Sequence, residues 1–137
     1  MNTQTLEQCV TASFANTPFP MVVARLAEAG VTAYTADLVA LRNTYYSAEN
    51  ESHDEALPLT GGPAIAPAFD AEGVAATVRA IQRQEIRYAE FLRRIMTAGC
   101  SHYEVFIKGR KVMYFGRDGE FYSEPFPIKN GQQAGAA

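Results

Sequence analysis

Three residues in the C-terminal half have side chains suited to nucleophilic chemistry: Cys100, His102 and Glu104. A cysteine activated by an imidazole is a nucleophile, and a carboxylate can orient the ring. If residues 99–108 form a strand, the three side chains share one face. Residues two apart on a strand are separated by about 6.5–7 Å at Cα, which is long for a hydrogen bond between cysteine and histidine. The alternative is a semi-buried cysteine beside a solvated His-Glu face.

A second candidate site lies around two predicted turns, at Lys108-Gly109-Arg110 and Asp118-Gly119. Arginine grips a phosphate or carboxylate with two parallel hydrogen bonds, and lysine contributes a point charge. The alternative is that these turns are solvent-facing and that nearby glutamates neutralise them in surface ion pairs. The candidate ligand-binding residues are Arg110, Lys111, Arg117 and Glu124.

Metal and cofactor chemistry finds little support in the residue pattern. His53 stands beside Asp54 in an acidic stretch, far from the His102 position, and such a pair falls short of the ligand sets that metals need. The sequence contains no Gly-rich phosphate loop and no recognisable Ser-His-Asp spacing. We therefore expect no metal and no cofactor. The two cysteines, Cys9 and Cys100, are too few for a disulfide scaffold and indicate reduced thiols.

Charge and hydropathy narrow the class of partner. The 137 residues carry a formal net charge of −3, with 47% hydrophobic and 20% charged residues. An acidic chain is a poor nucleic-acid binder, because that affinity depends on clustered basic residues. Residues 1–10 lack the pattern of a signal peptide, and no apolar run approaches the length of a membrane span. We expect a cytoplasmic protein that does not enter membranes.

The elements that position these residues follow from hydrophobic periodicity. Asp70 is a candidate N-cap for a helix that continues to about Ile81, and a second helical pattern runs over residues 86–95. We predict a break between the two helices at residues 83–86. After Gly99 the period becomes alternating, which predicts strands over 99–108, 111–115 and 120–124. Pro125 and Pro127 then end the last strand, because neither can donate to a ladder.

The same pattern occurs twice, at an offset of 69 residues. Ala29-Gly30, Tyr34 and Tyr45 return as Ala98-Gly99, Tyr103 and Tyr114, and Glu51 aligns with Glu120. Self-similarity at a fixed period indicates internal duplication. The paired tyrosines are therefore expected to be equivalent core positions of two halves.

The second half of the chain carries a family resemblance. It rests on residues spread over both predicted helices and all three strands: Ile86, Tyr88, Phe91, Met96, Ala98-Gly99-Cys100, Tyr103, Gly109-Arg110-Lys111-Val112, Tyr114, Gly116-Arg117, Gly119-Glu120 and Glu124-Pro125-Phe126-Pro127. In these residues the chain resembles the YbcV-like family, small bacterial proteins of unknown function that are often labelled phage envelope proteins. Glu85 and Ala89 depart from the Gly and Pro associated with the family there. The resemblance implies an α+β fold and brings no activity, cofactor or catalytic residue; the envelope label fits this sequence poorly.

The predicted architecture is one α+β domain over residues 1–128. Two helix–helix–hairpin halves, at about 1–51 and 70–120, share an antiparallel sheet that has helices on one face. Residues 47–69 form a connecting loop and 129–137 a flexible tail.

Two functions compete on this architecture. Phe106, Met113, Phe115 and Phe121 fall on the predicted sheet face away from the helices, covered either by the loop or by a partner. Our leading hypothesis is a non-enzymatic interaction module that forms a homodimer through this face. The alternative is a binding protein or enzyme for an anionic small molecule, with a cleft between the halves and the acidic loop as a lid.

Overall fold

A computed structural model describes residues 1–127 as two consecutive copies of a helix–helix–three-strand unit. The first repeat consists of α1 (Thr3–Phe14), α2 (Phe19–Glu28), β1 (Val31–Asp37), β2 (Arg42–Ser47) and β3 (Ser52–Ala56). The second repeat consists of α3 (Ala71–Gln82), α4 (Tyr88–Thr97), β4 (His102–Phe106), β5 (Lys111–Phe115) and β6 (Phe121–Pro125). The predicted tail at 129–137 lies outside the described residues.

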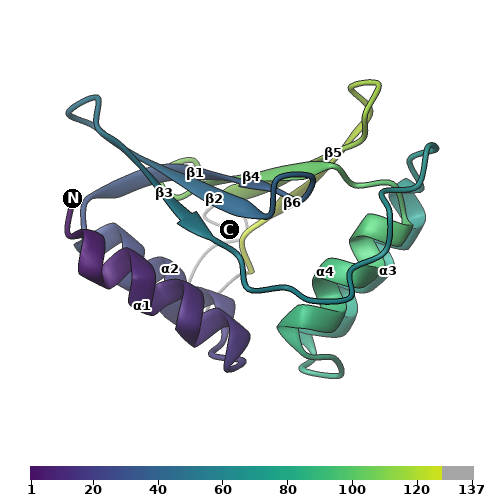
Figure 1. Cartoon of the computed structure of the whole chain (residues 1–137), viewed down its shortest axis with the longest axis horizontal. Helices are drawn as coiled ribbons and strands as arrows, with labels where there is room; N and C mark the ends of the chain where they lie inside the picture. Colours follow the sequence, from purple (N-terminus) through teal and green to yellow (C-terminus); the bar gives the residue numbers. More distant parts are fainter. Residues whose placement is uncertain (128–137) are drawn as a thin grey trace.

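The six strands form one antiparallel sheet in the order β3-β2-β1-β4-β5-β6, so each repeat contributes a three-stranded meander and the two meet at β1 and β4. In the described part of the chain both helix pairs lie on the same face of this sheet, α1 and α2 under one end and α3 and α4 under the other (Figure 1). The predicted α+β class, with an antiparallel sheet and helices on one face, is confirmed. The predicted break between the helices is also present, between Gln82 and Tyr88.

The repeat extends further than the sequence pattern indicated. Helix α4 starts 69 residues after α2, β5 starts 69 after β2, and β6 starts 69 after β3. The prediction of a loop over residues 47–69 is therefore wrong for the first part of this segment, which contains strand β3. Its residues are polar and acidic, which resembles a loop in sequence, but an edge strand tolerates such side chains. Pairing with β2 holds it in place.

Equivalent capping residues and turns mark the starts and ends of helices in both repeats. Asn2 and Asp70 cap α1 and α3, accepting hydrogen bonds from the backbone N–H groups of Thr5 and Gly73. Beyond α2 and α4 the chain turns through Gly30 and Gly99, with φ of 94° and 90°. Such left-handed values favour glycine, so both glycines set the point where a helix gives way to a strand.

Tyrosines fill equivalent places in the core, as expected. The rings of Tyr34 and Tyr45 lie 5.1 Å apart at an interplanar angle of 41°, and those of Tyr103 and Tyr114 lie 5.3 Å apart at 41°. All four side chains are buried. The halves also pack on each other, because the Tyr88 N–H donates to Asn16 Oδ1 at 2.9 Å.

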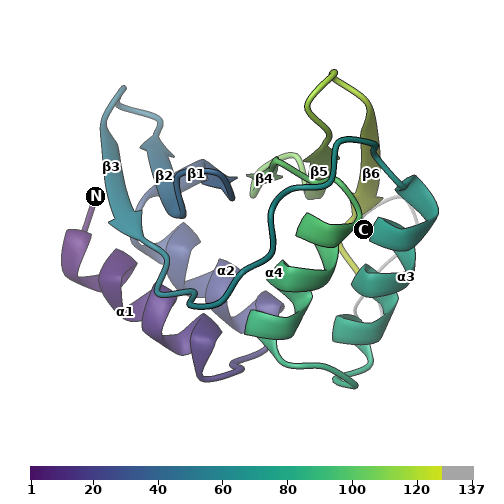
Figure 2. The same cartoon turned by 45° about the vertical axis from the view of Figure 1, so that its right-hand side comes forward.

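The segment that joins the repeats, residues 57–70, packs along α4 and leaves the opposite sheet face uncovered (Figure 2). Leu57, Leu59 and Ile65 are buried in the core. The Ala66 and Asp70 N–H groups donate to carbonyls at the end of α4. The alternative in which this segment buries the aromatic residues on the sheet face away from the helices is therefore wrong.

Candidate functional site

The uncovered side of the sheet, which we call the open face, carries every second residue of each strand. Its central row crosses all six strands: Asp54, Thr44, Thr35, Glu104, Met113 and Ser123. The alternate residues point toward the helices, so the strand period of two separates the open face from the core.

Aromatic and apolar side chains gather on the half of the open face that the second repeat supplies. We call this set the aromatic patch: His102, Phe106, Met113, Phe115 and Phe121. The His102 ring stacks on Phe115 at 4.8 Å, and Phe121 follows at 6.4 Å from Phe115. Phe121 is 57% exposed. An exposed aromatic side chain beside partly buried ones is typical of an interaction surface.

The nucleophile candidates are not brought together. Strand β4 begins at His102, so Cys100 precedes the alternating segment and its side chain turns into the core. Its thiol donates to the His102 carbonyl oxygen at 3.3 Å, and burial raises the pKa of Cys100 to about 12. The His102 Nδ1 instead meets Ser101 Oγ at 3.0 Å. His102 and Glu104 lie on the open face, without the thiol.

The four anion-binding candidates also separate. Arg110, at the β4–β5 turn, lies 5.5 Å from the Phe126 ring, whereas the Lys111 ammonium lies over Phe106 on the open face. Arg117 reaches the Ile65 carbonyl at 3.3 Å, beyond the other end of β5. Glu124 points to the helix side. These residues form no common cradle.

Glu124 is the centre of a polar cluster between β6 and α3. The Arg79 guanidinium donates to Glu124 Oε2 at 2.8 Å, and the Tyr122 hydroxyl donates to Oε1 at 2.5 Å. Gln82 adds a third hydrogen bond at 3.3 Å. Burial by itself would raise the pKa of Glu124, but the hydrogen bonds from Arg79, Tyr122 and Gln82 outweigh it and lower that pKa.

The first repeat holds a matching pair that the sequence analysis missed. His53 and Glu55 on β3 occupy the places of Tyr122 and Glu124 on β6, and the imidazole Nε2 contacts Glu55 Oε2. Beside Glu55 across the strand pair lies Asn43, whose Nδ2 donates to the Tyr45 hydroxyl at 2.9 Å. Within residues 1–127, Asn43 Oδ1 is a buried oxygen without a hydrogen-bond partner. Extending the 69-residue offset past Glu51 would have revealed this pair.

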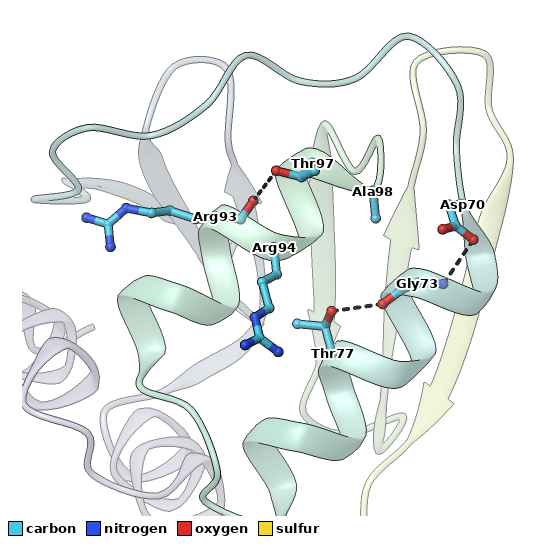
Figure 3. A pocket seen from close by; sticks show the side chains of 7 residues that line it. All are labelled: Asp70, Gly73, Thr77, Arg93, Arg94, Thr97 and Ala98. Atoms are coloured by element: carbon cyan, nitrogen blue, oxygen red, sulfur yellow. Dashed lines mark hydrogen bonds between the residues drawn. The ribbon is translucent and has the colours of Figure 1, made fainter.

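A concavity of about 370 Å³ lies between the start of α3 and the end of α4 (Figure 3). Its polar groups are already engaged. Asp70 caps Gly73, and the Thr77 hydroxyl donates to the Gly73 carbonyl at 2.8 Å. Arg94 pairs with Glu90 at 2.6 Å, and Arg93 extends away to the Thr60 carbonyl. This concavity lies within the second repeat and not between the halves.

In residues 1–127, none of the helices has the length and apolar character that crossing a bilayer requires.

Comparison with known proteins places the fold in a family. Uncharacterized proteins of Mycobacterium tuberculosis and Mycobacterium bovis are 32% identical to this chain over 108 residues. The matched segment covers 79% of this chain and 66% of each relative, so the chain spans just under two thirds of their length. Residues 15–125, from the end of α1 through β6, match the family described as a protein of unknown function, DUF1398. A match over that extent means that this chain belongs to the DUF1398 family.

Proposed function

We propose that this chain is an interaction module that binds a second copy of itself through the open face of its sheet. The observation that carries the proposal is the exposed Phe121 ring beside Phe115 and His102, on a face that the described helices and the connecting segment leave uncovered. Burying such rings removes apolar surface from water, which contributes a favourable free energy of about 25 cal/mol per Å² buried.

Charge on the open face favours a second copy over other partners. Glu104 and Lys111 lie at the edge of the aromatic patch and Asp37 lies opposite His102, so charges of both signs border the patch. In a twofold contact the same surface meets itself, and Lys111 of each copy can approach Glu104 of the other. A nucleic acid would instead meet a chain of net charge −3.

The size of the open face limits the area that a dimer can bury. Six strands spaced about 4.8 Å apart, each with about five residues on a rise of 3.3 Å, span roughly 29 by 17 Å. Two such faces would together bury about 1,000 Å² of surface, which is the lower limit for specific protein interfaces. We therefore expect a weak dimer whose population depends on protein concentration.

Sedimentation equilibrium over a range of about 1 to 500 μM tests this proposal. The expected result is a reversible monomer–dimer equilibrium in the micromolar range. A monomer over the whole range would overturn it. A dimer in which the rings of the aromatic patch show no contact between copies would also count against it.

A small-molecule ligand is the second candidate function. For the anionic ligand expected in a cleft between the halves, support is weak, because Arg110, Lys111, Arg117 and Glu124 lie apart. The unpartnered Asn43 Oδ1 favours a ligand of a different kind.

Two finer assignments belong with this proposal. We place the chain among the YbcV-like proteins, on the residues from Ile86 to Pro127 that carry that resemblance. We also assign it to the cytoplasm, with the support that Cys9 and Cys100 are free and buried, as in proteins of reducing compartments. A phage-related role has no support beyond the label.

A further inference from the structure

The two repeats treat the same acidic position differently. In the second repeat, the Glu124 carboxylate is covered by the Arg79 guanidinium and its side chain is 10% exposed. In the first repeat, the equivalent Glu55 side chain is 20% exposed and contacts His53.

Alignment of the first helices identifies what is missing. Asn2 and Asp70 cap α1 and α3 in the same way, so these helices correspond at an offset of 68 residues. The turns that follow agree, with φ of 69° at Asn16 and 58° at Gln84. Thr11 therefore stands where the second repeat has Arg79. No guanidinium comes from α1 to Glu55.

A second change accompanies the loss of the arginine. At the position equivalent to Val112 the first repeat has Asn43, which pairs directly with Glu55 across β2 and β3. Asn43 is 6% exposed, and its Oδ1 has no partner within the described residues. An unpaired buried carbonyl oxygen costs free energy, so a donor that reaches it is favoured.

We propose that the first repeat binds a guanidinium group between α1 and β3, at the place that corresponds to the Arg79 guanidinium. Glu55 supplies the carboxylate and Asn43 Oδ1 the second acceptor. A guanidinium presents a planar fork of N–H donors suited to two separate acceptors, whereas an ammonium ion is a compact point charge. The ligand class is a small molecule or an exposed arginine side chain that carries this group.

Neighbouring groups agree with a cation at this place. His53 and Glu55 are partly exposed, so solvent reaches the pair. On α1, Thr11 shares a polar surface with Gln4, Glu7 and Gln8. A metal is less well served, because residues 1–127 contain no group of three His, Cys, Asp or Glu side chains placed to hold one. The site lies on the helix side of the sheet and is independent of the proposed dimer.

Titration of the full chain with methylguanidinium chloride, followed by ¹H–¹⁵N NMR against sodium chloride at equal ionic strength, tests the proposal. We expect saturable shifts in the Asn43 side-chain amide and in the backbone of β3, with half-saturation in the millimolar range. Methylammonium chloride is expected to bind at least tenfold more weakly. No saturable shift in the wild-type protein, or equal binding of methylammonium, would overturn the proposal.

Exchange of residues between the repeats supplies matched variants. Thr11→Arg places the arginine of the second repeat into the first, and we expect it to raise the Tm and to abolish the methylguanidinium shifts. Arg79→Thr makes the converse change and opens a second site near Glu124, where methylguanidinium is expected to restore part of the lost Tm. Wild-type shifts that persist unchanged in Thr11→Arg would place binding elsewhere and refute the assignment. Glu55→Gln, with an expected loss of at least tenfold in affinity, checks the carboxylate independently.

Discussion

Thr35 and Glu104 lie directly opposite each other across the central β1–β4 pair of the sheet. They are also equivalent residues of the two repeats, separated by 69 positions. Two residues away in either direction, Ala33 pairs with Phe106 and Asp37 pairs with His102. The 69-residue offset makes Ala33 equivalent to His102 and Asp37 equivalent to Phe106. The local twofold axis of the domain therefore passes between Thr35 and Glu104. It relates the β3 edge, with its proposed guanidinium site, to the β6 edge, where Arg79 is built in.

The exposed ring of Phe121 tests the proposed dimer. Phe121→Glu places a charge in the aromatic patch, and we expect at least a tenfold weaker dimer in sedimentation equilibrium with an unchanged Tm within about 2 °C, because the side chain is exposed. Met21→Glu is the matched control, since Met21 is 51% exposed on α2, away from the open face. Equal weakening by both substitutions would contradict an interface at the patch.

Gly99 and Gly30 offer a paired test of the connecting segment. Alanine at either position must adopt a left-handed φ, which costs about 1 kcal/mol relative to glycine. At Gly99 an added Cβ would also lie 2.1 Å from the Ala68 carbonyl oxygen, whereas at Gly30 nothing lies within 4 Å.

We therefore expect Gly99→Ala to lower the free energy of unfolding by about 3 kcal/mol or more, and Gly30→Ala by about 1 kcal/mol, in urea denaturation. Similar losses for both variants would mean that residues 68–69 do not press on Gly99.

The Glu124 cluster predicts sensitivity to acid. The pKa of Glu124 is lower in the folded chain than the ordinary 4.5. Its contribution to the free energy of unfolding is therefore fully present above pH 4.5 and is lost as the pH falls through the folded pKa. We expect Glu124→Gln to remove this part of the decline in the free energy of unfolding below pH 4.5. Urea denaturation at a series of pH values measures it. Glu28→Gln on α2 serves as an exposed control, and an unchanged acid slope in Glu124→Gln would contradict the arrangement.

Thiol reactivity tests whether Cys100 can act as a nucleophile. Burial raises the pKa of Cys9 and raises that of Cys100 to about 12, so the thiolate is scarce at neutral pH. We expect both thiols of the native protein to react with a disulfide reagent at pH 8 at least a hundredfold more slowly than after unfolding. Cys100→Ser identifies which thiol any fast signal comes from. Rapid labelling of Cys100 in the native protein would restore Cys100, His102 and Glu104 as a candidate nucleophilic site.

Much of the fold was predictable because it depends on local signals. Gly30 and Gly99 mark the change from helix to strand, and the alternation at Tyr103 and Val105 gives the buried face of β4 correctly. Strand β3 was missed since its stability comes from pairing with β2, while its own residues are polar. The face of Cys100 was also misjudged, because β4 begins at His102, two residues after Cys100, so the strand alternation does not extend back to the cysteine.

The sequence alone determined the duplication, the α+β class and the equivalence of the core tyrosines, because repeated side-chain types at a fixed spacing demand repeated local structure. Which groups meet was decided by the tertiary structure. The joining of β1 to β4 creates one continuous open face, and the packing of α3 on β6 brings Arg79 to Glu124 across 45 residues of chain. Contacts between distant segments depend on sheet register and helix docking, which no local pattern specifies. The replacement of Arg79 by Thr11 in the first repeat can therefore be interpreted only from the tertiary structure.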